Sequence, residues 1–140
     1  MPNLLEDLAA VDLFADLDAK HLKGIANLVE ERSIRDGEEV VREGDYSHYF
    51  YVVFSGSADV SVRGKHRGAV GPREFFGELA MLGHTQSATV RAMEPMRLGV
   101  IDAKQFYSLL DSEPRIAVHL VESLILRLEE ITVRPVGQLV

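Results

Sequence analysis

The chain has no cysteine and no tryptophan among its 140 residues. Without cysteine, disulfides, thiolate chemistry and the usual zinc-finger patterns are excluded. No apolar run approaches the roughly 18 residues of a membrane span. The first ten residues carry Glu6 and Asp7 and lack the basic segment of a secretion signal. We therefore expect a cytoplasmic protein with no membrane segment.

Positive charge is also scarce. The formal net charge is −7 and the sequence pI is about 5.2. No Lys/Arg cluster stands out along the chain. Because neutralisation of phosphates supplies most of the affinity of duplex binders, we expect no direct nucleic-acid binding.

Catalytic and metal-binding motifs are missing as well. The five histidines form no HxH or HxxxH pair, so metal-ligand spacing is absent: His21, His48, His66, His84 and His119. No P-loop, Rossmann fingerprint or nucleophile elbow is found. Glu43 and Asp45 flank a glycine and are interpreted as turn residues rather than an acid/base pair. The sequence predicts no enzyme, no metal and no cofactor.

What is present is a three-part layout within one domain, 1–140. Residues 1–31 show helical periodicity, with Asn3 and Asp18 as N-caps of two helices, the second running from Ala19 to Glu31. Residues 32–102 show short β-type segments separated by turn signals, one of them a hairpin turn at 64–68. The fold class predicted is mainly β, a sandwich or barrel with flanking helices.

Residues 103–132 are predicted to form two C-terminal helices, the last one ending before the segment 134–137, which contains Pro135. Apolar residues of that helix are spaced 4, 3, 4, 3: Ala117, Val121, Leu124, Leu128 and Ile131. This pattern is a short heptad repeat, which predicts a dimer interface. The alternative interpretation, a single broad stripe facing the domain core, stays open.

The segment from Phe75 to Ala92 carries the most specific chemistry. It begins with two aromatic residues and Gly77, continues with Glu78 in an apolar setting, and resumes after a loop as a β-type segment. A loop of this kind presents main-chain N–H groups that can bind an anion. Glu78 has two interpretations: an acceptor for a ligand hydroxyl, or a buried carboxylate paired with a main-chain N–H or an arginine.

These motifs, taken together and in order, resemble the cyclic nucleotide-binding domain family, which includes Crp-like regulators and protein kinase A regulatory subunits. The resemblance spans about Leu13 to Glu130. It rests on five motifs, which are Glu43-Gly44-Asp45, the strand and glycine turn at 51–57, Gly71-Pro72, Phe76-Gly77-Glu78-Leu79-Ala80, and Ser87-Ala88-Thr89-Val90-Arg91-Ala92.

The resemblance implies a β jelly-roll barrel that binds cyclic AMP or cyclic GMP. It places eight residues at the ligand: Phe76, Gly77, Glu78, Leu79, Ala80, Gln86, Ser87 and Ala88. Glu78 would accept from the ribose 2′-hydroxyl, Leu79 and Ala80 would offer main-chain N–H groups to the phosphate, and Ser87 would add a donor.

The resemblance also implies roles outside this segment. Four glycines would adopt positive φ at turns: Gly44, Gly56, Gly71 and Gly77. The last helix would act as a lid and homodimer seam, and would approach the base through Leu124, Arg127 or Leu128.

This sequence departs from the family at Gln86, where an arginine grips the phosphate. Glutamine has no charge and no bidentate fork, so we expect cyclic nucleotide affinity to be about 30- to 1000-fold weaker than with arginine. No Arg or Lys lies between Glu78 and Thr89. His84 or Arg91 could supply the missing cation from elsewhere in the fold. The alternative interpretation is that His84 is a solvated loop residue and Arg91 an exposed strand residue.

Two functional hypotheses follow. In the first, the domain is a non-catalytic sensor that binds a cyclic nucleotide weakly, cyclic AMP before cyclic GMP. In the second, it is a degenerate domain that serves as a dimerisation or docking module, with its pocket empty or occupied by another small ligand.

Overall fold

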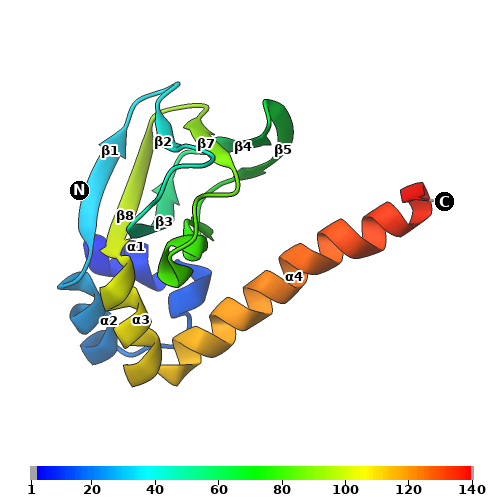
Figure 1. Ribbon diagram of the computed structural model, residues 1–140. Helices are drawn as coiled ribbons and strands as arrows, with labels where there is room; N and C mark the ends of the chain where they lie inside the picture. The colour runs from blue at the N-terminus through cyan, green and yellow to red at the C-terminus, as the bar shows by residue number, and fades with distance from the viewer. Residues whose placement is uncertain (1–2, 140) are drawn as a thin grey trace.

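The computed structural model describes the backbone of residues 3–139 and the side chains of residues 3–79 and 82–129. Two antiparallel sheets form the body, helices gather at one end, and a long C-terminal helix runs out past the strands (Figure 1). The predicted mainly β fold with flanking helices is confirmed.

Each sheet has four strands. The first has the order β1 (Glu30–Ile34), β8 (Met96–Asp102), β3 (Tyr49–Ser55) and β6 (Phe75–Phe76). The second has the order β2 (Glu39–Val41), β7 (Thr89–Ala92), β4 (Ala58–Val62) and β5 (Lys65–Val70). β5 begins at Lys65, so most of the segment predicted as a hairpin turn at 64–68 is strand.

An apolar core forms where the two sheets face each other. Alternation along the strands builds it: in β7, Val90 and Ala92 are buried, whereas Arg91 between them is exposed. Val53 and Leu98 contribute from the first sheet with no exposed surface. This packing fixes the side of each sheet on which its polar residues lie.

Two short helices and a 3-10 turn precede the sheets: α1 (Leu4–Ala9), η1 (Asp12–Phe14) and α2 (Ala19–Ala26). Both predicted caps are confirmed, because Asn3 accepts from the main-chain N–H groups of α1 and Asp18 accepts from that of His21. The prediction that the second helix reaches Glu31 is wrong. Residues from Glu30 onward pair instead with β8, and these ladder bonds replace the helical ones.

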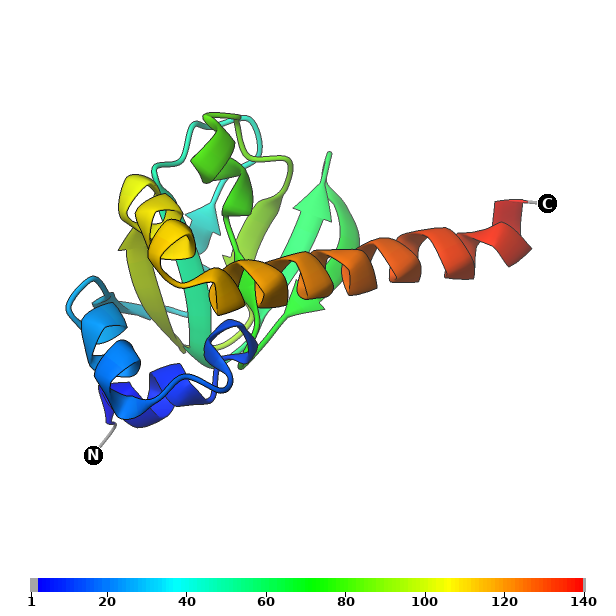
Figure 2. The same cartoon turned by 90° about the horizontal axis from the view of Figure 1, so that it is seen from below.

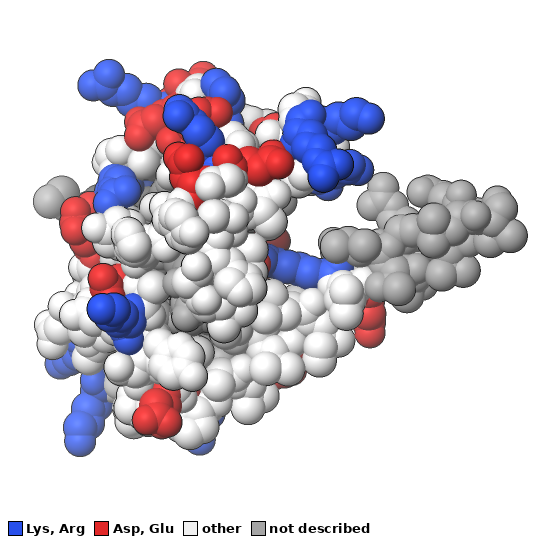
Figure 3. All heavy atoms as spheres, viewed as in Figure 1, with Lys and Arg blue, Asp and Glu red and all other residues white. Residues whose placement is uncertain are grey.

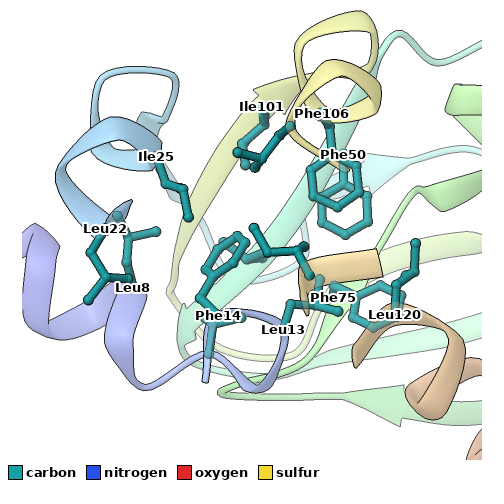
Figure 4. Packing of buried hydrophobic residues seen from close by; sticks show 14 residues of the cluster. Leu8, Leu13, Phe14, Leu22, Ile25, Phe50, Phe75, Ile101, Phe106 and Leu120 are labelled. Carbon is teal, nitrogen blue, oxygen red and sulfur yellow. The ribbon is translucent and has the colours of Figure 1, made fainter. Parts of the chain in front are cut away.

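A second core joins the helices to the outer face of the first sheet (Figure 4). Phe50 of β3 and Phe106 of α3 (Ala103–Ser112) stack with ring centroids 4.0 Å apart, and neither has exposed surface. Asp102 caps α3 as predicted. This packing fixes α3 and therefore the start of the next helix.

Helix α4 (Pro114–Leu139) has apolar residues both on its buried side and on its exposed side. Ile116 and Leu120 are buried against the domain, whereas Val118, Val121 and Ile125 are exposed on other sides of the helix.

The predicted end of this helix near Thr132 is wrong, because α4 continues through Pro135 to Leu139 (Figure 2). Proline removes one main-chain hydrogen bond at a cost of ~3 kcal/mol, a local penalty that does not end the helix here. The side chain of Ile131 lies outside the described residues.

Candidate ligand-binding site

A pocket of about 330 Å³ is bounded by strands β4, β5, β6 and β7, by the loop segments before and after η2 (Glu78–Leu82), and by Arg127 near the middle of α4. Its apolar wall includes Val60, Val70, Phe75, Phe76 and Val90. Its polar groups come from the segment 77–88, which we call the cassette, from β5, from Glu74 and from α4. The space-filling view shows a hollow between the body and α4 (Figure 3). A concave, mostly apolar site with a few convergent polar groups is typical of small-ligand binding.

Seven of the eight residues that the sequence placed at the ligand line this pocket together: Phe76, Gly77, Glu78, Leu79, Gln86, Ser87 and Ala88. Ala80 follows in the 3-10 turn η2 (Glu78–Leu82), and its side chain lies outside the described residues.

A tight turn after β6 presents Glu78. Gly77 has φ +86°, and a Cβ there would lie 2.9 Å from the main-chain oxygen of Tyr49, so only glycine fits. Glu78 then opens η2, with its side chain 28% exposed and Oε1 3.6 Å from a guanidinium nitrogen of Arg127. The carboxylate is thus an available acceptor at the pocket wall, paired at long range with an arginine of α4.

Gln86 is held from both sides by main-chain hydrogen bonds. Its N–H donates to the oxygen of Asp45, and its oxygen accepts from the N–H of Gly44, each at 2.9 Å. Its residue surface is only 7% exposed. Within the described part of the chain, its side-chain Nε2 is buried and has no hydrogen-bond partner. An unpaired buried donor costs ~1–3 kcal/mol, a cost that a ligand acceptor in the pocket would remove.

The aromatic floor of the site is neutral. Tyr51 stacks on Phe76 with centroids 4.8 Å apart, and Phe75 stacks on Phe50 at 5.4 Å. Burial raises the pKa of the Tyr51 phenol above its ordinary value. The phenol therefore remains uncharged near neutral pH and adds no charge behind Phe76, which lines the pocket.

The two cations suggested for the missing arginine do not reach the pocket. Arg91 turns to the outer face of its sheet, where a guanidinium nitrogen lies 2.8 Å from Glu39 Oε2. His84 is exposed in the loop after η2. Neither lines the pocket, so the interpretation of both as surface residues holds.

Two other arginines line the pocket, Arg67 of β5 and Arg127 of α4. Sequence reasoning missed Arg67, because the strand that carries it was interpreted as a turn. Arg63, Lys65 and Arg67 are all exposed on the β4–β5 hairpin, a basic cluster that the sequence analysis did not predict. Basic side chains gather beside the hollow in the space-filling view (Figure 3). The expectation that the chain has no basic cluster is therefore wrong locally.

The glycine expectation holds at three of four positions. Gly44, Gly56 and Gly77 have positive φ. Gly71 is not among the residues with positive φ, so that prediction is wrong. In its place, Arg73 two residues later takes the left-handed conformation, with φ 77°.

Across the described residues, no group of three or more His, Asp or Glu side chains is placed to hold a metal ion. The helices of the described chain are each too short or too polar to cross a membrane.

Comparison with known proteins agrees with this geometry. The model of the cyclic nucleotide-binding domain matches residues 31–113. A candidate potassium channel protein of Rhodopseudomonas palustris is 34% identical over 114 residues, 79% of this chain and 28% of that protein. A cAMP-dependent protein kinase regulatory subunit of Yarrowia lipolytica is 32% identical over 99 residues, 70% of this chain and 26% of that protein.

Solved structures show the same fold. The cAMP-bound structure of PfPKA-R matches with a TM-score of 0.76 at 26% identity, over 96% of this chain and 45% of that one. The chain spans about a quarter of the length of the curated relatives above. The two sheets and flanking helices are the jelly-roll arrangement of these proteins, and the family model covers more than half of the sequence. The chain belongs to the cyclic nucleotide-binding domain family.

Proposed function

We propose that this domain is a non-catalytic sensor module that binds a cyclic nucleotide, cyclic AMP in preference to cyclic GMP, and acts in the cytoplasm. The observation that carries the proposal is the unpaired, buried amide of Gln86, which shares a pocket with the carboxylate of Glu78. One supplies a donor for a phosphate oxygen, and the other supplies an acceptor for a sugar hydroxyl. Relatives named as cAMP-dependent kinase subunits support cyclic AMP.

Binding is expected to be weak. A cyclic phosphate carries one negative charge, and Gln86 meets it with a neutral amide. Charge-assisted hydrogen bonds are roughly twice as strong as neutral ones. Gln86 therefore contributes less to cyclic nucleotide affinity than an arginine at the same position would. The C-terminal helix, whose Arg127 enters the pocket, is the element that passes the bound state on.

Titration calorimetry with cyclic AMP and cyclic GMP tests the proposal. Wild-type protein is expected to bind cyclic AMP more tightly, and Glu78→Gln is expected to lose about 10- to 100-fold in affinity, because a charged acceptor for the sugar hydroxyl is removed. Glu30→Gln, the same change at an exposed residue of β1, is the matched control.

Equal affinity of Glu78→Gln and wild type removes Glu78 from the site. No heat with either nucleotide at millimolar concentration contradicts the proposal as a whole. Chromatography of the recovered ligand checks that the domain is not an enzyme, because a noncyclic product would show turnover.

A second candidate function is a dimerisation or docking module. The feature that favours it is the exposed apolar surface of α4, where Val118, Val121 and Ile125 are 56, 54 and 50% exposed. Pairing with a second copy of the helix would cover these side chains. In the sensor hypothesis, the same pairing makes a homodimer through the C-terminal helix.

We predict that Val121→Asp converts the protein to a monomer in sedimentation velocity, because a carboxylate in a helix–helix seam is buried without a partner. Tyr107→Asp places the same charge on an exposed residue of α3 and is expected to leave the oligomeric state unchanged. A dimer that persists in Val121→Asp would remove this face from the interface.

A further inference from the structure

The charge inside the pocket poses a problem for an anionic ligand. Glu78 and Glu74 both line it, and Gln86 at the expected phosphate position is neutral. A phosphate entering beside Glu78 would meet like charge, which is costly in a partly buried site unless a cation offsets it. A cation must therefore reach the ligand, and the segment between residues 78 and 89 contains no Lys or Arg. Of the two arginines that line the pocket, Arg67 is exposed on the β4–β5 hairpin, whereas Arg127 lies beside Glu78.

Arg127 is placed to be that cation. From α4, its guanidinium lies over the ring of Phe75, 4.1 Å from the centroid. One nitrogen donates to the main-chain oxygen of Phe75 at 2.5 Å, and another lies 3.6 Å from Glu78 Oε1. The side chain is 36% exposed, so it lies at the inner edge of the pocket rather than in bulk solvent.

The contacts of Arg127 leave it able to serve a ligand. Its contact with Glu78 is a single one at 3.6 Å, which is longer than the about 2.7–2.9 Å of the hydrogen bonds in a bidentate arginine–carboxylate pair. A guanidinium has five N–H donors, and among the described residues one hydrogen bond, to the main-chain oxygen of Phe75, uses them. Stacking on Phe75 holds the planar group at the pocket wall by a cation–π contact.

We propose that Arg127 is the anion-binding cation of this pocket, supplied by helix α4 in place of the cassette arginine that Gln86 replaces. This inference rests on the proposed function and names the chemical class of ligand, a ribonucleoside with a singly charged cyclic phosphodiester. Glu78 binds the sugar hydroxyl, Gln86 donates its free amide to the phosphate, and Arg127 offsets one of the two negative charges that the phosphate and Glu78 bring together.

In this arrangement, binding of the anion depends on the position of helix α4. An arginine on the cassette itself would lie beside the phosphate regardless of the position of the last helix. Here the cation lies in the fourth turn of α4, so the phosphate is bound fully only when α4 is docked on the pocket. The resemblance to the family implied that Arg127 approaches the base, whereas in this structure it contacts the cassette itself.

The test compares cyclic AMP with adenosine, which has the same base and ribose but no phosphate. Affinities for both are measured by calorimetry on wild type, Arg127→Gln and the matched control Lys65→Gln, which removes one positive charge from the exposed hairpin outside the pocket. Arg127→Gln is expected to lose about 10- to 100-fold for cyclic AMP and less than about twofold for adenosine. Lys65→Gln is expected to change neither.

A double variant adds an independent readout. Introducing Gln86→Arg into Arg127→Gln is expected to restore cyclic AMP binding to wild-type affinity or better, because the cation returns to the pocket from the other side. Unfolding curves of each variant without ligand check that α4 still docks.

The outcomes separate the inference from the function on which it rests. If Arg127→Gln weakens cyclic AMP and adenosine alike, Arg127 acts by packing and the inference is wrong. If it changes neither ligand, the inference is also wrong, although the sensor function stands. If wild type binds neither cyclic AMP nor cyclic GMP, the proposed function itself fails and the inference fails with it.

Discussion

Replacing Gln86 by arginine is expected to tighten cyclic AMP binding by about 30- to 1000-fold. The side chain at this position is buried, lines the pocket and carries an unpaired donor. A guanidinium there adds a full charge and a bidentate fork toward the phosphate, worth several kcal/mol where water is excluded, and each ~1.4 kcal/mol is tenfold in affinity. Calorimetry on the purified variant measures the change.

The matched control is Thr85→Arg, which adds the same charge at the exposed neighbouring residue outside the pocket. A gain of similar size in Thr85→Arg would show that net charge, not position, governs affinity. Unchanged cyclic AMP affinity in Gln86→Arg would mean that the phosphate does not lie at Gln86.

The largest effect on stability is predicted at Gly56, which turns the chain from β3 into β4. Its φ is +83°, and a Cβ there would lie 2.4 Å from the main-chain oxygen of Pro95 and 2.9 Å from Met96 Cα. Gly56→Ala therefore combines the left-handed penalty of ~1–2 kcal/mol with a backbone clash of ~1–3 kcal/mol. We expect a loss of ~3 kcal/mol or more in the free energy of unfolding, measured by urea denaturation.

Gly64→Ala separates the two contributions. Gly64 also has positive φ, +78°, but a Cβ there meets nothing within 4 Å. Its alanine variant is expected to lose only the conformational term, ~1–2 kcal/mol. Equal losses in the two variants would show that the predicted clash at Gly56 is absent.

Features encoded by neighbouring residues could be predicted from the sequence. The caps at Asn3, Asp18 and Asp102 satisfy N–H groups two or three residues away, and strand β8 follows from its own apolar pattern. The composition of the cassette is local as well, since its glycine, carboxylate and amide lie within one short segment, 77–86.

Features that depend on distant partners could not be predicted. The end of α2 depends on pairing between Glu30 and Val100, which lie far apart in the sequence. The pocket's cations come from β5 and α4. The family resemblance placed Arg127 near the ligand base, but nothing near Arg67 or Arg127 in the sequence indicates that they line one pocket with Glu78. The course of α4 past Pro135 likewise contradicts the local preference of that residue.

The central claim is that a cyclic nucleotide occupies the pocket beside Glu78 and Gln86, and the most direct measurement is a ¹⁵N-resolved NMR titration with cyclic AMP. The account predicts that the side-chain amide resonances of Gln86 shift and saturate together with the main-chain amides of Leu79 and Ser87. Saturating cyclic AMP that leaves the Gln86 side chain unshifted, or that shifts only residues away from the pocket, would contradict it.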